Sequence, residues 1–151
     1  MAAQREQSVA DIFSKQKRSE VMSHIRSRGN RSTELTLAKL LRNEGISGWR
    51  LLREKPVTPD FLFLGRRICV FVDGCFWHGC PKCFRQLASN VAYWRGKIAR
   101  NRQRDRDNRR ALRRAGYRVF RIWECSLRRP HYAKRFAARL QTALHRFRPQ
   151  E

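Results

Sequence analysis

The chain has 151 residues, with 35 Lys or Arg against 12 Asp or Glu, so its net charge at pH 7 is +23. This length matches one domain, and a charge of this size predicts a polyanionic partner. Nucleic acid is favoured over a membrane, because no apolar run reaches the ~18 residues that would span a bilayer.

Residues 1–31 are expected to form a basic, largely flexible N-terminal arm, and residues 32–151 a single domain. No signal-peptide h-region is present, so we expect a cytoplasmic protein whose cysteines are reduced. Basic arms of this kind often enter a groove of the nucleic acid. The plain alternative is a basic protein that merely coats nucleic acid.

Hydrophobic periodicity and the positions of Gly and Pro predict the secondary structure in chain order. The segment Ile68 to Val72 is continuously apolar, which suits a strand buried on both faces. The order helix, three strands, helix, strand, helix predicts an α/β sheet flanked by helices. The predicted elements are a helix over 33–44 capped by Ser32 or Thr33, strands over 49–53, 60–64 and 67–73, a turn at Gly65-Arg66, a polar helix over 91–115, a strand over 117–124 and an amphipathic helix after Pro130.

Four of the five cysteines have a spacing that predicts a zinc site. Cys75, Cys80 and Cys83 form C-x4-C-x2-C, and Cys125 comes at the end of the last predicted strand. Four thiolates close the tetrahedral shell of zinc, and a closed shell is structural because it leaves no position for an activated water. Reduced core cysteines without a metal are the alternative, which fits Cys69 inside its strand.

Asp60 is the candidate metal-binding carboxylate, because Pro59-Asp60-Phe61 opens a strand and the next strand ends in Asp73. A metal-dependent nuclease needs an acid at such a strand end, since Mg²⁺ prefers oxygen ligands and must also touch the scissile phosphate. The alternative for the Pro-Asp pair is an ordinary turn.

Two adjacent aromatic residues and a histidine follow Cys75 directly. Phe76 and Trp77, if exposed, would wedge between base pairs, and His78 would act as general base for the attacking water. The alternatives are core packing for the two aromatic residues, and a further zinc ligand or a surface position for the histidine.

These segments together resemble the very-short-patch repair endonucleases over about residues 19–129. The combination of Gly-Cys-Phe-Trp-His at 74–78 with Trp-Glu-Cys at 123–125 is the most specific part of the resemblance. The other matching segments are Met22 to Arg26, Glu34, Leu40-Leu41, Pro59 to Phe61, Val70 to Asp73, Asn90 to Asp105 and Gly116 to Val119.

The resemblance implies a fold similar to the PD-(D/E)xK restriction endonucleases, a mixed sheet flanked by helices with one structural zinc. It also implies a strand-specific endonuclease that uses Mg²⁺ to nick DNA on the 5′ side of the T in T·G mismatches, which arise when 5-methylcytosine deaminates. The implied partners are double-stranded DNA with such a mismatch and, functionally, a cytosine-5 DNA methyltransferase. The protein is expected to act as a monomer in the bacterial cytoplasm, at the nucleoid during repair and away from membranes.

Position by position, the resemblance implies that Asp60 and the main-chain carbonyl of Val72 bind Mg²⁺. His78 activates the water, and Glu34 orients the water or His78. Asp73 joins the catalytic candidates, but the best-known branch of the family has histidine at this position. Three roles for Asp73 therefore stay open: it binds a second metal, it orients His78, or it has no role. The implied zinc ligands are Cys75, Cys80, Cys83 and Cys125, with Cys80 in place of what is often a histidine.

The resemblance further implies that Phe76, Trp77 and Trp94 enter the DNA from the major-groove side, while the arm holds the minor-groove side. Phosphate contacts are expected from Lys97, Arg100, Arg102 and Arg104 on the polar helix, although a solvated face explains any one of them equally well. Two other functions stay open: a non-catalytic zinc-stabilised protein that marks mismatches, and a double-strand restriction nuclease, which would usually need two coordinated active sites.

Overall fold

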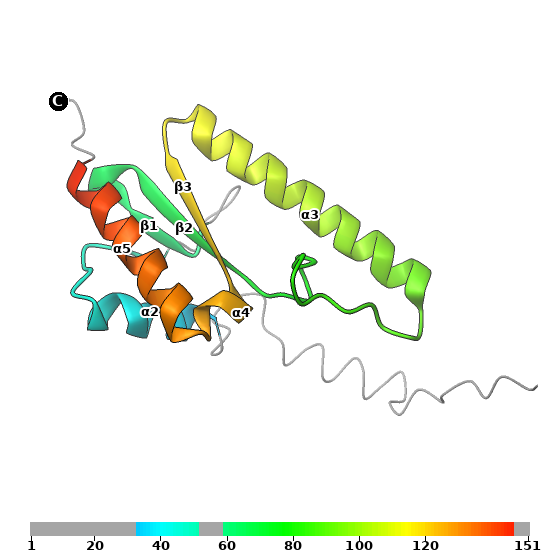
Figure 1. The fold of residues 1–151 in the computed structure, drawn as a ribbon. Coiled ribbons are helices and arrows are strands. Elements are labelled where there is room, and N and C mark those ends of the chain that lie inside the picture. The colour runs from blue at the N-terminus through cyan, green and yellow to red at the C-terminus, as the bar shows by residue number, and fades with distance from the viewer. Residues whose placement is uncertain (1–32, 52–58, 147–151) are drawn as a thin grey trace, which may run out of the picture.

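A computed structural model describes residues 33–51 and 59–146 (Figure 1). The arm predicted over 1–31 lies outside the described residues. Of the strand predicted over 49–53, the described part contributes one antiparallel bridge between Arg50 and Leu62. The elements are helix α2 (Glu34–Asn43), strand β1 (Phe61–Phe63), the 3-10 turn η1 (Leu64–Arg66), strand β2 (Ile68–Asp73), helix α3 (Val91–Arg114), strand β3 (Arg118–Trp123), helix α4 (Glu124–Leu127) and helix α5 (Pro130–Arg146).

The described strands form a three-stranded sheet in the order β1-β2-β3, with β2 antiparallel to β1 and parallel to β3. Helix α3 makes the crossover that a parallel pair requires. The predicted α/β class, a small mixed sheet with helices, is therefore confirmed. In the parallel register Asp73 pairs with Trp123, so β2 and β3 end together at one edge of the sheet.

The hydrophobic core lies between the sheet and the two helices α2 and α5. Leu37 and Leu41 of α2 are fully buried, as is Leu140 of α5, because apolar residues recur every three or four positions along both helices. From the sheet, Val70 and Phe120 point into this core. Side chains alternate along a strand, so the neighbours of these residues lie on the opposite face of the sheet.

Helix α3 differs from α2 and α5 because, of its 24 residues, only Trp94 and Ile98 are buried. It runs alongside β3, away from α2 and α5 (Figure 1). Asn101 and Asp105 continue the stripe that Trp94 and Ile98 begin, at spacings of three and four residues. One narrow face of α3 therefore meets the rest of the protein, and the other faces carry exposed basic side chains.

One predicted boundary is corrected, and one predicted turn is confirmed with its form now defined. The last strand was predicted to include Glu124, but it ends at Trp123, and Glu124 opens the four-residue helix α4, which was not predicted. The turn at Gly65-Arg66 takes the form of a 3-10 turn, which Arg67 ends with a positive φ of 47°. Along residues 33–51 and 59–146, no helix has the length and apolar character needed to cross a membrane.

Candidate functional site

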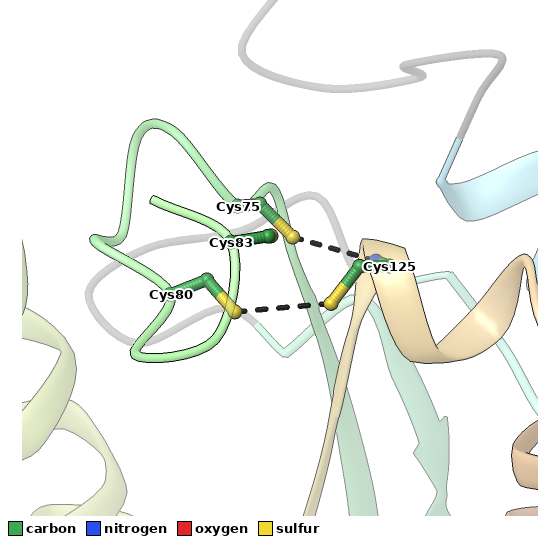
Figure 2. A group of neighbouring side chains, drawn as sticks. All are labelled: Cys75, Cys80, Cys83 and Cys125. Atoms are coloured by element: carbon green, nitrogen blue, oxygen red, sulfur yellow. Dashed lines mark hydrogen bonds between the residues drawn. The ribbon is translucent and has the colours of Figure 1, made fainter. Parts of the chain in front are cut away.

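The Sγ atoms of Cys75, Cys80, Cys83 and Cys125 all lie within 4.8 Å of one another (Figure 2). The Sγ atoms of Cys80 and Cys125 are 3.8 Å apart, and a tetrahedron with metal–sulfur bonds of about 2.3 Å has edges of about 3.8 Å. These four residues can therefore hold a metal, as the spacing predicted. Cys69 lies apart from them in β2, where burial raises the pKa of its thiol to about 12.

The sheet register explains why Cys75 and Cys125 meet. Each lies two residues beyond a strand end, and those ends, Asp73 and Trp123, are paired. The backbone N–H of Cys125 donates to Sγ of Cys75 over 3.4 Å. The short helix α4 therefore turns the chain back toward the loop after β2.

The loop that carries Cys80 lies against α3. Gly79 has φ +61°, and a Cβ atom there would stand 3.0 Å from Cγ2 of Ile98. Glycine is thus needed both for the left-handed backbone and for the close approach. The amide of Asn101 on α3 also donates to the carbonyl of Trp77 over 3.0 Å, so the loop is attached to α3 on one side and to the cysteine cluster on the other.

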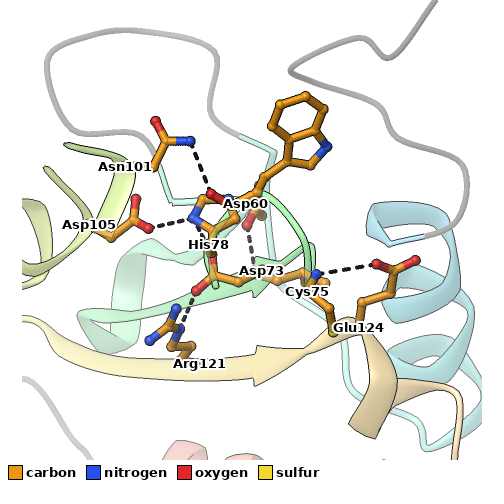
Figure 3. A network of polar contacts seen from close by, with 10 residues as sticks. Asp60, Asp73, Cys75, His78, Asn101, Asp105, Arg121 and Glu124 are labelled. Atoms are coloured by element: carbon orange, nitrogen blue, oxygen red, sulfur yellow. Dashed lines mark hydrogen bonds and ion pairs between the residues drawn. The ribbon is translucent and has the colours of Figure 1, made fainter. Parts of the chain in front are cut away.

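Asp60 lies just before β1, and its Oδ2 accepts a hydrogen bond from the backbone N–H of Val72 over 2.7 Å (Figure 3). Burial, together with the nearby charges of Glu34 and Asp73, raises the pKa of Asp60 to about 7, against the lowering effects of this hydrogen bond and of His78. A partly buried carboxylate that lies near other acids is stabilised by a cation. This site therefore fits a divalent metal ion.

His78 belongs to the loop after β2 and faces α3, where its Nδ1 is hydrogen-bonded to the carboxylate of Asp105 (Figure 3). Oδ1 of Asp73 is 3.8 Å from the same nitrogen. Burial lowers the pKa of His78, but the hydrogen bond to Asp105 and the charges of both acids outweigh it, so the pKa lies above its ordinary value. Because Nδ1 is occupied by Asp105, Nε2 is the ring nitrogen left for a substrate or water.

Asp73 is buried, and its carboxylate forms an ion pair with Arg121 of β3. The guanidinium carbon of Arg121 stands 3.9 Å from the centre of the Trp123 ring. Asp60, Asp73 and His78 therefore share one end of the sheet, with Glu34 close enough to influence the pKa of Asp60.

The aromatic residues of the loop pack against the first turn of α3. The ring centre of Phe76 is 5.2 Å from that of Trp77 and 5.4 Å from that of Trp94. Trp94 is buried, whereas Phe76 and Trp77 are partly exposed, and all three lie outside the main core. Packing within this aromatic cluster thus explains the burial of Trp94 but leaves part of the surface of Phe76 and Trp77 accessible.

The predicted phosphate-contacting residues differ in their surroundings. Nζ of Lys97 lies 5.4 Å from the Trp77 ring and 5.5 Å from the Trp94 ring, so Lys97 belongs to the aromatic cluster. Arg100 and Arg104 are exposed on the same side of α3, at spacings of three and four residues from one another and from Lys97. Arg102, also exposed, lies on another side of the helix, where it packs on Gly79.

Sequence reasoning missed three residues of this site: Asn101, Asp105 and Arg121. The first two could have been found from the stripe along α3, because they follow Trp94 and Ile98 at helical spacing. Arg121 interrupts an apolar strand, and a charged residue in a buried strand usually has a partner. Its partner, Asp73, is 48 residues earlier in the chain.

Comparison with known proteins identifies the family of this chain. The sequence profile described as DNA mismatch endonuclease Vsr matches residues 10–84. The DNA mismatch endonuclease Vsr of Escherichia coli (strain K12) is 36% identical over 122 residues, which cover 80% of this chain and 77% of that protein. The chain belongs to the Vsr family of DNA mismatch endonucleases. It is therefore a nuclease, a hydrolase that acts on DNA, and the non-catalytic alternative is excluded.

Two type II nicking enzymes are also similar to this member of the Vsr family. V.XorIIP of Xanthomonas oryzae pv. oryzae is 38% identical over 120 residues, which cover 79% of this chain and 88% of that enzyme. V.NaeI of Lentzea aerocolonigenes is 50% identical over 68 residues, which cover 45% of this chain and 41% of that enzyme. The chain thus spans less than half the length of V.NaeI but most of V.XorIIP.

Proposed function

We propose that this protein nicks one strand of duplex DNA on the 5′ side of the T in a T·G mismatch, by Mg²⁺-dependent hydrolysis. Mismatches of this kind arise from 5-methylcytosine deamination, so the enzyme would work beside a cytosine-5 DNA methyltransferase. The observation that carries the proposal is the meeting of Asp60, a partly buried carboxylate that fits a cation, with the His78–Asp105 pair at one end of the sheet. We further propose that the sheet and its helices are a restriction-endonuclease-like fold and that the protein acts as a monomer.

In the proposed mechanism Asp60 and the carbonyl of Val72 would hold Mg²⁺, which when bound would supply positive charge to the scissile phosphate and the leaving 3′ oxygen. His78 accepts a proton from the attacking water at Nε2, because Asp105 keeps the other ring nitrogen occupied. Glu34, at the start of α2, orients this water.

The proposed metal at Cys75, Cys80, Cys83 and Cys125 is Zn²⁺, which four thiolates fit in number and spacing. Its role is structural. It would hold Cys75 and Cys80, and so the segment between them, against the end of β3. That segment includes His78, whose charge acts on Asp60, and the partly exposed Phe76 and Trp77, so the zinc would hold all three in place.

We propose that Phe76 and Trp77 insert beside the mispaired bases, with Trp94 supporting them and entering the DNA with them. Lys97, Arg100 and Arg104 share one side of α3 and would contact phosphates, together with Arg102 on the neighbouring side. A mismatched step is easier to unstack than a paired one, so an aromatic wedge favours mismatched DNA.

The proposal is tested with a duplex labelled on both strands that carries one T·G pair, beside a T·A control duplex, in Mg²⁺. We expect a single nick, 5′ of the mispaired T, and little cleavage of the control. Cleavage of both strands of the control would indicate the restriction-type alternative instead, and a nick on the G strand would contradict the proposed strand choice.

The double substitution Phe76→Ala with Trp77→Ala is expected to lower the preference for T·G over T·A duplexes roughly ten- to hundred-fold, since stacking on a base contributes roughly 1–3 kcal/mol. Binding of fully paired DNA should change little, because phosphate contacts remain. Competition binding with both duplexes measures this. Leu64→Ala, which removes an exposed apolar side chain after β1, is the control. Equal losses of affinity for both duplexes in the double variant would contradict the insertion of these rings beside the mismatch.

A further inference from the structure

Asp73 stands where a second metal-binding carboxylate is expected, but both of its oxygens face protein side chains. Its side chain is 6% exposed. Oδ2 is bound by Nε of Arg121, and Oδ1 lies 3.8 Å from Nδ1 of His78 (Figure 3). A metal ion at Asp73 would have to reach a nearly buried carboxylate and compete with Arg121 for it.

Arg121 is itself held in place. The strand register pairs Phe71 with Arg121 and Asp73 with Trp123, so Arg121 is the diagonal neighbour of Asp73 on the same face of the sheet. Its guanidinium stacks on the Trp123 ring at 3.9 Å. A planar guanidinium fixed on both a ring and a carboxylate is not a mobile surface charge.

In the described part of the chain, Asp73 also does not belong to a preformed cluster of His, Cys, Asp or Glu ligands. Among the described residues, one group of three or more His, Cys, Asp or Glu side chains has all its ligand atoms within 4.8 Å of one another. That group is the four cysteines. Asp73 does not form such a group with Asp60 and His78. Mg²⁺ is commonly bound by one or two carboxylates with phosphate and water completing its shell, so Asp60 can suffice as the side-chain ligand.

We propose that Arg121 is a positioning residue that keeps Asp73 out of the metal site, and that the Asp73–Arg121 pair forms a fixed support beneath His78. This inference rests on the proposed function, in which Asp60 holds the metal. It assigns Asp73 the role of supporting His78, and not that of a metal ligand. Removing Arg121 frees a buried carboxylate next to the metal site, and that carboxylate then becomes a metal ligand.

The test measures Mn²⁺ binding by electron paramagnetic resonance, with the full chain bound to the nicked T·G duplex, after subtraction of the duplex alone. Asp73→Asn is expected to bind Mn²⁺ within about twofold of the unmodified protein. Arg121→Ala is expected to bind Mn²⁺ about tenfold more tightly, while nicking of the intact duplex becomes slower. Opposite changes in affinity and rate distinguish positioning from a merely structural role.

The double variant Asp73→Asn with Arg121→Ala should return Mn²⁺ affinity to that of the unmodified protein, because the freed carboxylate is gone. Arg118→Ala is the matched control: Arg118 is on the same strand and lies over the Phe120 ring, without a carboxylate partner in the described part of the chain. If Arg121→Ala does not fold, Arg121→Lys retains the charge without the planar stack and should tighten Mn²⁺ binding about threefold.

Loss of Mn²⁺ affinity in Asp73→Asn, or unchanged affinity in Arg121→Ala, would overturn the inference. The proposed function is judged separately by Asp60→Asn, which should lose Mn²⁺ binding. If that variant still binds Mn²⁺, the metal role of Asp60 fails, whereas the comparison of the Asp73 and Arg121 variants still decides whether Arg121 restrains Asp73.

Discussion

Replacing Asp60 by asparagine is expected to slow nicking by about 10³- to 10⁴-fold, equivalent to roughly 4–5 kcal/mol of transition-state stabilisation. Asparagine keeps the shape of the side chain and an oxygen that can accept the hydrogen bond from Val72. It removes the negative charge that holds the metal. The rate is measured under single-turnover conditions on the T·G duplex, so that slow product release does not conceal the change.

The same substitution is expected to stabilise the metal-free protein at pH 8. Burial raises the pKa of Asp60 to about 7, whereas an unfolded aspartate has a pKa of about 3.9. Between these values the folded protein binds a proton that the unfolded chain has lost, so stability falls as the pH rises from about 4 to about 7. Asparagine avoids this loss, so the melting temperature should rise by roughly 5–10 °C at pH 8 and change little near pH 4.

Added Mg²⁺ should raise the melting temperature of the unmodified protein and leave that of Asp60→Asn unchanged. Asp107→Asn serves as the control, because Asp107 is exposed on α3 and bonds to Gln103. A variant that lost activity but responded to Mg²⁺ as before would show that Asp60 acts in some other way.

Removing the cluster metal is expected to have the second large effect. Cys125→Ser, or treatment with a strong chelator, should lower the melting temperature by ~10 °C or more and abolish nicking, because structural zinc sites contribute many kcal/mol to folding. The purified protein should contain one zinc per chain by atomic absorption, and Cys125→Ser much less. Cys69→Ala, which removes a cysteine outside the cluster, should keep its zinc.

Catalysis should be lost even where the core survives. The main core involves α2, α5 and the sheet, whereas His78 lies in the loop that the cysteines hold. Far-ultraviolet circular dichroism of Cys125→Ser should therefore retain helical signal at temperatures where nicking has ceased. Full activity without zinc would contradict a structural role for the cluster.

The sequence predicted the elements of the core well, because α2 and α5 show clear helical periodicity and β2 is a continuous apolar run. Helix α4 was missed because four residues are too few to produce a periodic pattern. The cysteine cluster was predicted from spacing, since sulfur ligands have few alternative roles in a chain without disulfides.

The polar network around His78 was harder to predict. Asp105 is one of many charged residues on α3, and its partner, His78, is 27 residues earlier in the chain. Asp73 forms its ion pair with Arg121, and this pairing could not be predicted without knowing the register of β2 with β3. Periodicity identifies which face of an element is buried, but pairing between distant polar side chains requires the topology.

The segment from Cys75 to Cys80 combines two attachments to the metal cluster with Phe76, Trp77 and His78 between them. The residues proposed to recognise the mismatch and the residue proposed to activate water therefore depend on the same metal cluster. A molecule whose thiols are oxidised would lose both abilities together. Damage to this enzyme would then produce an inert protein, and not a nuclease that cuts intact chromosomal DNA without discrimination.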